Sequence, residues 1–390
     1  MDEAVRRRAA AEAVRLAGAL SWWWLLRGRL YEARGALAAV AAAVPDSAEA
    51  RVLHAAFALL TGERPAGADI AAVRDGRAAW LYAYGLFHIG EPGASEKANA
   101  RARELFTEDG DPWGTAAALG LQAMLALVRG DLAAIAADGP RSAALFREIG
   151  DRWGELQTVA PLAVLAEIKG DYAAAERGQH EGLRIARELG LQNEVAARLS
   201  GLGRLALLAH DWERARDLHE RARRMAAEQG YRYVETHALM GLALGARRSG
   251  DLDAAAAHLA RIRDEYESSM IGEHLLLAEF GFTAELRGDG PEAAAYHRRA
   301  LEIARTLADP RAVALSLEGL AGALVLTGDA AGAARLLGAA DAARRGAGAP
   351  LPEAERGDVD RITAAATAVL GEEAFAAAFR GGADTPATAY

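Results

Sequence analysis

Histidine, the commonest metal ligand and proton carrier near neutral pH, occurs nine times in this chain. A zinc protease site needs the run His-Glu-x-x-His, which sets two imidazoles on one helix face with a glutamate as general base. His219-Glu220 begins such a run but lacks the second histidine. No other pair of histidines has ligand spacing together with a carboxylate, so the sequence predicts no metal site.

The stretch Ser200-Gly201-Leu202-Gly203 matches neither a nucleophile elbow nor a nucleotide-binding motif. It lacks the glycine that precedes the serine in a Gly-x-Ser-x-Gly elbow, and it lies in a helical pattern where that strained turn cannot form. It also has no preceding strand and no third glycine, which a dinucleotide fingerprint requires. We therefore interpret Ser200 as a packing residue.

Lysine is rare, since only Lys97 and Lys169 occur, and neither lies in a phosphate-binding loop. Paired acids such as Glu372-Glu373 are typical of solvated helix faces and caps. We therefore predict no catalytic residue and no cofactor: the chain is not an enzyme. An enzyme with a site across the repeats stays the weakest of three hypotheses.

Composition predicts an all-α protein. The chain has 390 residues, of which 52% are hydrophobic and only 6% aromatic, and alanine dominates. A net charge of -9 argues against direct binding of nucleic acid, which needs a basic face. Without cysteine there is no disulfide. The apolar run from Leu16 to Leu26 is too short to span a membrane, and it favours a packed helix over an export signal. We therefore expect a cytoplasmic protein that does not associate with a membrane.

A dipeptide of glycine and an acid recurs along the chain, and it predicts tight turns between helices. Glycine can close a helix in the left-handed conformation, and the acid that follows can cap the next helix. The gaps are 40, 40, 40, 40, 38 and 40 residues. The series is Gly90-Glu91, Gly130-Asp131, Gly170-Asp171, His210-Asp211, Gly250-Asp251, Gly288-Asp289 and Gly328-Asp329.

A second glycine series falls midway, at Gly110, Gly150, Gly190 and Gly230. Two turns in each period predict two helices of roughly 18 residues each. Apolar residues between the turns keep helical spacing, and such a helix pair buries its apolar faces only by stacking on its neighbours. The pattern therefore predicts an α-solenoid.

Small residues recur where neighbouring helices must approach each other, at Ala163, Gly203 and Ala243 before the turns and at Ala175 and Ala215 after them. This spacing resembles the tetratricopeptide (TPR) consensus. The resemblance implies a right-handed solenoid of about nine TPR-type helix pairs with a period of about 40 residues. A HEAT-like or armadillo-like solenoid, whose repeats have similar length, stays open as the rival architecture.

The expected organisation is a TPR-type superhelix over residues 1–345, followed by capping helices and a frayed tail over residues 346–390. The stretch 64–75 is too short for a full helix, so we expect one incomplete repeat there. Pro140 and Pro161 interrupt helical patterns and are expected to kink or break their helices.

Both ends of the chain extend the resemblance. The strings 334–340, 349–352 and 370–375 resemble the closing segment of the TPR arm of large actinobacterial transcriptional regulators. Those are the AfsR-like or MalT-like, SARP-type and LuxR-type proteins with a nucleotide-binding (STAND) switch domain. The opening, 15–17 with 22–28, is similar to the start of that arm.

The resemblance implies a sensor or interaction module in transcriptional control. We find no phosphate loop and no helix-turn-helix in the sequence, so we expect either a free-standing relative or an excised arm. The lead hypothesis is a non-catalytic module that binds a protein, a peptide or a small effector in its concave groove.

The resemblance also implies where a partner would bind, because the first helix of each pair lines the concave wall in TPR proteins. The matching positions are Arg77, Trp80, Tyr84, His88, Gln157, Arg204, His237, Arg247 and Glu285. Trp80 and Tyr84 also fit a second interpretation, as core residues that pack on the preceding pair.

The tryptophans fall into two groups, a pair one period apart and a run of three near the start of the chain. Trp113 and Trp153 lie one period apart, which favours packing, because a residue copied by the repeat is usually structural. The run Trp22 to Trp24 is interpreted as a first-repeat core or a docking face. An exposed run predicts a homodimer, so a self-associating scaffold is the second hypothesis.

Overall fold

The computed structural model describes residues 10–65, 67–266 and 270–386, and all regular structure in these ranges is helical. The chain divides into two compact units. Unit 1 comprises residues 1–128 and 133–158, and unit 2 comprises residues 129–132 and 159–390. The expected all-α class is confirmed.

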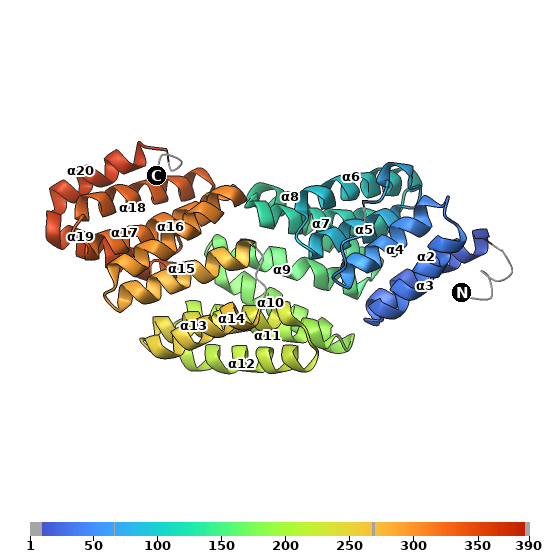
Figure 1. Ribbon diagram of the computed structural model, residues 1–390, viewed down its shortest axis with the longest axis horizontal. Coiled ribbons are helices and arrows are strands. Elements are labelled where there is room, and N and C mark those ends of the chain that lie inside the picture. The colour runs from blue at the N-terminus through green and yellow to red at the C-terminus, as the bar shows by residue number, and fades with distance from the viewer. Residues whose placement is uncertain (1–9, 66, 267–269, 387–390) are drawn as a thin grey trace. The chain divides into compact units, whose positions relative to one another are not determined.

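Unit 1 is built from consecutive helices that pack side by side (Figure 1). Its elements are α2 (Ala10–Leu26), α3 (Leu30–Ala43), α4 (Ala48–Leu60), the 3-10 helix η1 (Ile70–Ala72), α5 (Gly76–His88), α6 (Pro92–Asp109), α7 (Pro112–Arg129), α8 (Leu132–Ile149) and the first turns of α9 (Arg152–Ile168).

Unit 2 repeats the same arrangement, and the first helices of adjacent pairs, α11, α13, α15 and α17, also contact one another. Its further elements are α10 (Tyr172–Glu188), α11 (Gln192–Leu208), α12 (Trp212–Glu228), α13 (Arg232–Arg248), α14 (Leu252–Glu265), α15 (Met270–Leu286), α16 (Gly290–Leu307), α17 (Pro310–Leu326), α18 (Ala330–Gly346), the 3-10 helix η2 (Glu353–Glu355), α19 (Gly357–Leu370) and α20 (Glu372–Ala383).

Both series of predicted turns are confirmed. Every glycine of the two series has a left-handed backbone, for example Gly170 with φ 76°. At the position where the series has histidine, His210 takes the same conformation with φ 59°. In five turns of the first series the aspartate then accepts from a backbone amide of the next helix, as Asp171 does from Ala174 and Asp251 does from Ala254. Glu91 makes no such bond. Each turn therefore ends one helix and starts the next.

The irregular stretch expected near residues 64–75 is also found. Between the end of α4 and the start of α5 the described backbone forms only η1, and the buried side chain of Val73 fixes this connection to the core.

The expected helix breaks at proline are wrong. Pro140 lies inside α8 and Pro161 lies inside α9, and both helices continue through them. Proline removes one backbone hydrogen bond and crowds the previous turn, at a cost of about 3 kcal/mol. The buried side chains of Ile135 and Phe146, on either side of Pro140, offset that loss by packing.

Helices approach closely where a large side chain of one helix fills a slot over a glycine of another. The ring of His219 lies between Gly203 and Gly241, and a Cβ added at Gly241 would stand 2.2 Å from its Cε1. Two helix pairs later, His297 lies in the same way between Gly281 and Gly319. Phe106 over Gly114 and Phe146 over Gly154 use the same device in unit 1.

The C-terminal helices close the array by an even tighter contact. A Cβ at Gly338 of α18 would lie 2.0 Å from the carbonyl oxygen of Phe379, and one at Gly382 would lie 1.9 Å from that of Arg335. Because only glycine allows backbones to meet this closely, α20 is fixed to α18 independently of α19. The capping helices expected within residues 346–390 are present as α19 and α20.

We predict that Gly319→Ala destabilises the chain by about 1–3 kcal/mol, because the added methyl group must displace the imidazole of His297 from a packed slot. Urea unfolding followed by circular dichroism measures the change.

Gly178→Ala is the matched control. Gly178 lies within α10 with no heavy atom within 4 Å of an added Cβ, so alanine should stabilise the helix by up to about 1 kcal/mol. Equal stability of the two variants would contradict the slot as a packing constraint.

Burial in these slots also sets the charge state of the histidines. Burial first, with smaller contributions from Arg247 and His274, lowers the pKa of His297 to about 3. Burial and the neighbouring His237 likewise lower the pKa of His219 to about 3. Both imidazoles are therefore neutral in the folded protein at physiological pH.

We predict that stability falls as pH drops from 7 toward 4. The unfolded chain binds protons at these histidines below pH about 6.5, whereas the folded chain does not until pH about 3. Each histidine then contributes a slope of up to about 1.4 kcal/mol per pH unit.

Replacing His297 by leucine, the residue at the equivalent Leu337, removes one such group. The slope of unfolding free energy between pH 5 and 6 should become shallower in His297→Leu and shallower again when His219→Leu is added. An unchanged slope in the double variant would show that the two imidazoles are not buried neutral.

Candidate functional site

The first four candidate residues, Arg77, Trp80, Tyr84 and His88, lie along α5 in unit 1. The ring of Trp80 stacks on Tyr84 with centroids 5.1 Å apart, and Tyr84 contacts the ring of His88 at 4.2 Å. His88 is exposed, and its Nδ1 lies 2.9 Å from the carbonyl oxygen of Tyr84, so this nitrogen carries the proton. Trp80 is only 3% exposed, which supports its interpretation as a core residue.

Trp80 nevertheless lines a cavity of about 420 Å³, here called the tryptophan pocket. Its aromatic wall is formed by Trp22 of α2, Trp80 of α5 and Trp113 of α7. Trp22 meets Trp113 edge to face at 4.9 Å and meets Trp153 of α9 at 4.7 Å. Such pairs hold aromatic rings in fixed orientations, so this wall is a rigid apolar surface.

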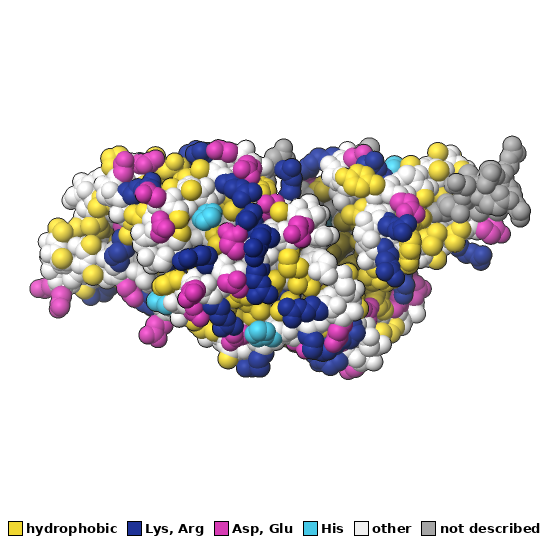
Figure 2. All heavy atoms as spheres, turned by 90° about the horizontal axis from the view of Figure 1, so that it is seen from below, with side chains coloured by type: hydrophobic (Ala, Val, Ile, Leu, Met, Phe, Trp, Pro, Cys, Tyr) yellow, Lys and Arg dark blue, Asp and Glu magenta, His cyan; other side chains and the backbone are white. Residues whose placement is uncertain are grey.

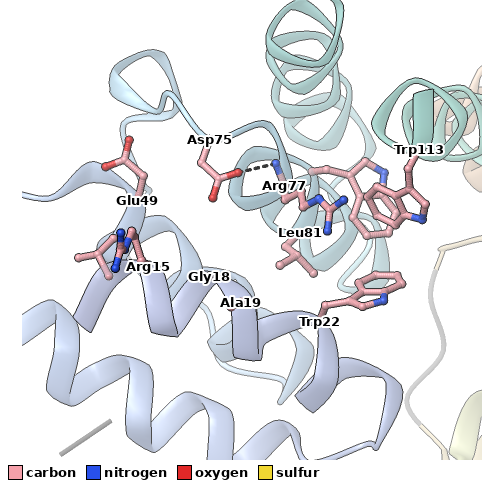
Figure 3. A pocket seen from close by; sticks show the side chains of 11 residues that line it. Arg15, Gly18, Ala19, Trp22, Glu49, Asp75, Arg77, Leu81 and Trp113 are labelled. Carbon is pink, nitrogen blue, oxygen red and sulfur yellow. Dashed lines mark hydrogen bonds between the residues drawn. The ribbon is translucent and has the colours of Figure 1, made fainter. Parts of the chain in front are cut away.

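Arg77 stands at the mouth of the pocket beside Trp113, with Trp22 opposite on α2 (Figure 3). Its guanidinium lies 4.8 Å from the Trp113 ring centroid and 3.8 Å from a carboxylate oxygen of Asp111. The indole nitrogen of Trp113 donates to Asp151 over 2.5 Å. Arg77 is thus held in place by an aromatic face while half of its side chain stays exposed.

The rest of the pocket is polar and electrically balanced. Arg15 and Arg77 contribute positive charge, and Glu49 and Asp75 contribute negative charge. The indole N–H of Trp80 is buried and has no hydrogen-bond acceptor among the described residues. A buried donor without an acceptor is unfavourable by about 1–3 kcal/mol.

The run Trp22 to Trp24 does not form one surface. Trp24 is buried, Trp22 belongs to the aromatic wall, and Trp23 alone is exposed, at 42%, with Arg29 over its ring. Self-association through this run would therefore depend on a single tryptophan.

The candidate Gln157 lies half-buried on α9.

The remaining candidates lie in unit 2, where three of them form ion pairs with the C-terminal region. Arg204 of α11 donates to Glu355 over 2.6 Å. Arg247 of α13, 3% exposed, donates to Asp358 over 3.0 Å.

Glu285 of α15 completes this set. It accepts from both terminal nitrogens of Arg361, over 2.5 and 2.8 Å. The first helices of three successive pairs thus present charged side chains to the start of α19 and to η2, and each of these charges has a partner of opposite sign.

Electrostatics supports these pairs. Burial alone would raise the pKa of Glu355, but the guanidinium groups of Arg204 and Arg248 outweigh it, and the pKa lies below its usual value. The same balance, with Arg247 and Arg361 as the cations, lowers the pKa of Asp358. Both carboxylates are therefore charged at neutral pH.

His237, the last candidate, belongs to a cluster that the sequence did not predict. Its Nδ1 lies 2.8 Å from the hydroxyl of Ser200, which also lies 3.2 Å from Nδ1 of His219. A serine between two imidazoles resembles a catalytic pair, but Ser200 is fully buried in α11. No carboxylate hydrogen-bonds to either imidazole among the described residues, so this is a buried packing network.

Within the described ranges there is no group of three or more potential ligands that could hold a metal ion. The same ranges contain no helix long and apolar enough to cross a membrane. Figure 2 shows arginine and lysine side chains lying among aspartate and glutamate side chains on the face in view, without a broad surface of one sign.

Comparison with known proteins gives a fold but no family. No protein-family model matches the chain, and no curated protein matches it. The crystal structure of a Rap protein complexed with competence and sporulation factor is similar with a TM-score of 0.66 and 13% identity, over 86% of this chain and 99% of that chain. This likeness supports a TPR-like helical repeat.

Two further solved structures match with TM-scores below 0.5. They are BtubC from P. vanneervenii, with a TM-score of 0.41 and 20% identity over 56% of this chain and 92% of that chain, and the P58(IPK) TPR domain, with a TM-score of 0.27 and 15% identity over 92% of this chain and 99% of that chain.

Proposed function

We propose that this chain is a non-catalytic TPR-type interaction module that holds a segment of a protein or peptide partner at the tryptophan pocket of unit 1. The observation that carries the proposal is a preformed apolar wall of three tryptophans beside an exposed arginine. Aromatic residues and arginine in one well-packed pocket are the usual composition of an interaction hot spot.

The geometry favours a peptide over a metal or a purely ionic ligand. The aromatic wall accepts an apolar side chain, whereas the half-exposed guanidinium of Arg77 suits backbone or carboxylate oxygens. The Rap protein that shares this fold was solved as a complex with competence and sporulation factor. That complex gives a precedent for ligand binding on this fold, and it does not identify the ligand here.

The same proposal includes a role in transcriptional control, which depends on the resemblance of both chain ends to the TPR arm of AfsR-like, SARP-type and LuxR-type regulators. In such a protein the module would sense a partner or small effector in the cytoplasm and pass the signal to other domains. Sequencing the reading frame around this segment tests that role, because the proposal expects a nucleotide-binding switch domain in the same operon or frame.

Arg77→Ala tests the location of binding. Peptides of 12 residues are selected from a random display library on the full chain, and their affinities are then measured by fluorescence anisotropy. We expect a loss of about tenfold or more in Arg77→Ala, since hot-spot truncations remove about 2 kcal/mol or more. Trp fluorescence should change on binding, because three tryptophans line the pocket.

Arg103→Ala supplies the matched control, because Arg103 is exposed on α6 of the same unit and lies outside the pocket. Its affinity should equal that of the wild type. Equal affinity of Arg77→Ala, or equal losses in the two variants, would remove the pocket as the binding site.

A further inference from the structure

The residues 349–361, here called the C-terminal segment, reach much farther than a cap needs to. A cap must cover only the exposed end of the last helix pair, and α20 already does so through its contact with α18. The C-terminal segment instead pairs with Arg204 of α11, which belongs to a pair three repeats earlier. Closing the solenoid does not explain this contact.

The contacts of the segment follow a regular order. Arg361 pairs with Glu285 of α15, Asp358 pairs with Arg247 of α13, and Glu355 pairs with Arg204 of α11.

Pro352 continues the order, since its Cβ is the nearest atom, at 3.8 Å, to a Cβ added at Gly170 after α9. From Pro352 to Arg361, the partner advances by one repeat every three residues. The segment thus crosses the first helices of four pairs in the same order as they follow one another in the chain.

The face that receives the segment keeps its own charge balance without it. Arg204 also lies 3.6 Å from Glu167 of α9, and Arg247 also lies 2.8 Å from Glu279 of α15. A buried cation that lost every partner would strongly destabilise the fold. Because each of these arginines has a second carboxylate on the face itself, the segment up to Asp358 can leave without stranding either arginine. The buried Glu285 keeps its partner Arg361, which directly precedes the buried anchor Ile362.

The segment is also joined to the fold at both ends by contacts of another kind. Ala349 is buried before it, and Ile362 is buried after it in the apolar core that α19 shares with α17 and α18. Between these points the segment itself is half-exposed and held mainly by charge. Its release would therefore be local and would leave α18 and α20 in place.

We propose that the face formed by α9, α11, α13 and α15 is a second binding site, for an acidic peptide of a partner, and that the C-terminal segment occupies it as a displaceable stand-in. The stand-in shows the chemistry of the partner: two carboxylates three residues apart, matched to Arg204 and Arg247. The proposal shares with the proposed function only the premise of an interaction module, and it uses residues of unit 2 instead of the tryptophan pocket.

The test uses the full chain and a fluorescent synthetic peptide with the sequence of residues 349–364. Replacing Glu355 and Asp358 together by lysine should expel the segment and leave the arginine face open. The labelled peptide should then bind this variant at least about tenfold more tightly than the wild type, whose face is already occupied. A peptide with both acids replaced by lysine should not bind.

The matched control is Glu372→Lys with Glu373→Lys, which makes the same charge change on the exposed start of α20. This variant should bind the labelled peptide as the wild type does. Hydrogen exchange provides a second readout: amides 350–361 should exchange faster in the first variant and unchanged in the control, with α18 and α20 protected in both.

The proposal fails if the peptide binds the two lysine variants equally or binds neither. If the first variant loses its helical circular dichroism, Glu355→Gln with Asp358→Asn replaces it, and the same comparison decides. Arg77→Ala does not change this face. Measuring the display-selected peptide and the 349–364 peptide on the variants of both sites therefore shows which of the two proposals fails.

Discussion

The left-handed turn that ends each helix is the constraint on which the rest of the molecule depends. Because the turns recur at a fixed spacing, α9 to α13 all have 17 residues. Helices of equal length bring equivalent positions to the same height in successive pairs. The position three residues before a turn is then occupied by Glu167, Arg247 and Glu285, and these charges line one face. Through α9 to α13 the constant helix length keeps the glycine slot of His219 and the charged positions in register.

The fold was largely predictable because its signals are local. A glycine that must be left-handed and an aspartate that caps the next helix act within a few residues, so their spacing alone located the helices. Pro140 and Pro161 misled the prediction because their local preference was overridden by packing from neighbouring helices. The glycines opposite His219 and His297 gave no readable signal, since a slot exists only when two helices meet.

The candidate sites were less predictable, for a different physical reason. Arg77, Trp80, Tyr84 and His88 share one helix, so helical spacing was enough to group them. Trp113 was predicted to be a packing residue, and Trp22 a core or docking residue. Both line the pocket, because in a small repeat unit the same ring can support the core and face an opening. The pairing of Arg204 with Glu355 joins residues 151 positions apart, and no periodicity in the sequence connects them.

The apolar anchors on both sides of the C-terminal segment have a further consequence. A short tether that joins a ligand to its own receptor gives an effective concentration in the millimolar range. Ion pairs that are individually worth only about 1 kcal/mol or less at partly exposed sites are then sufficient to keep the segment in place. The effective concentration of the C-terminal segment at this face therefore does not depend on the expression level of the protein. Mutations can weaken or strengthen individual ion pairs while the segment stays bound.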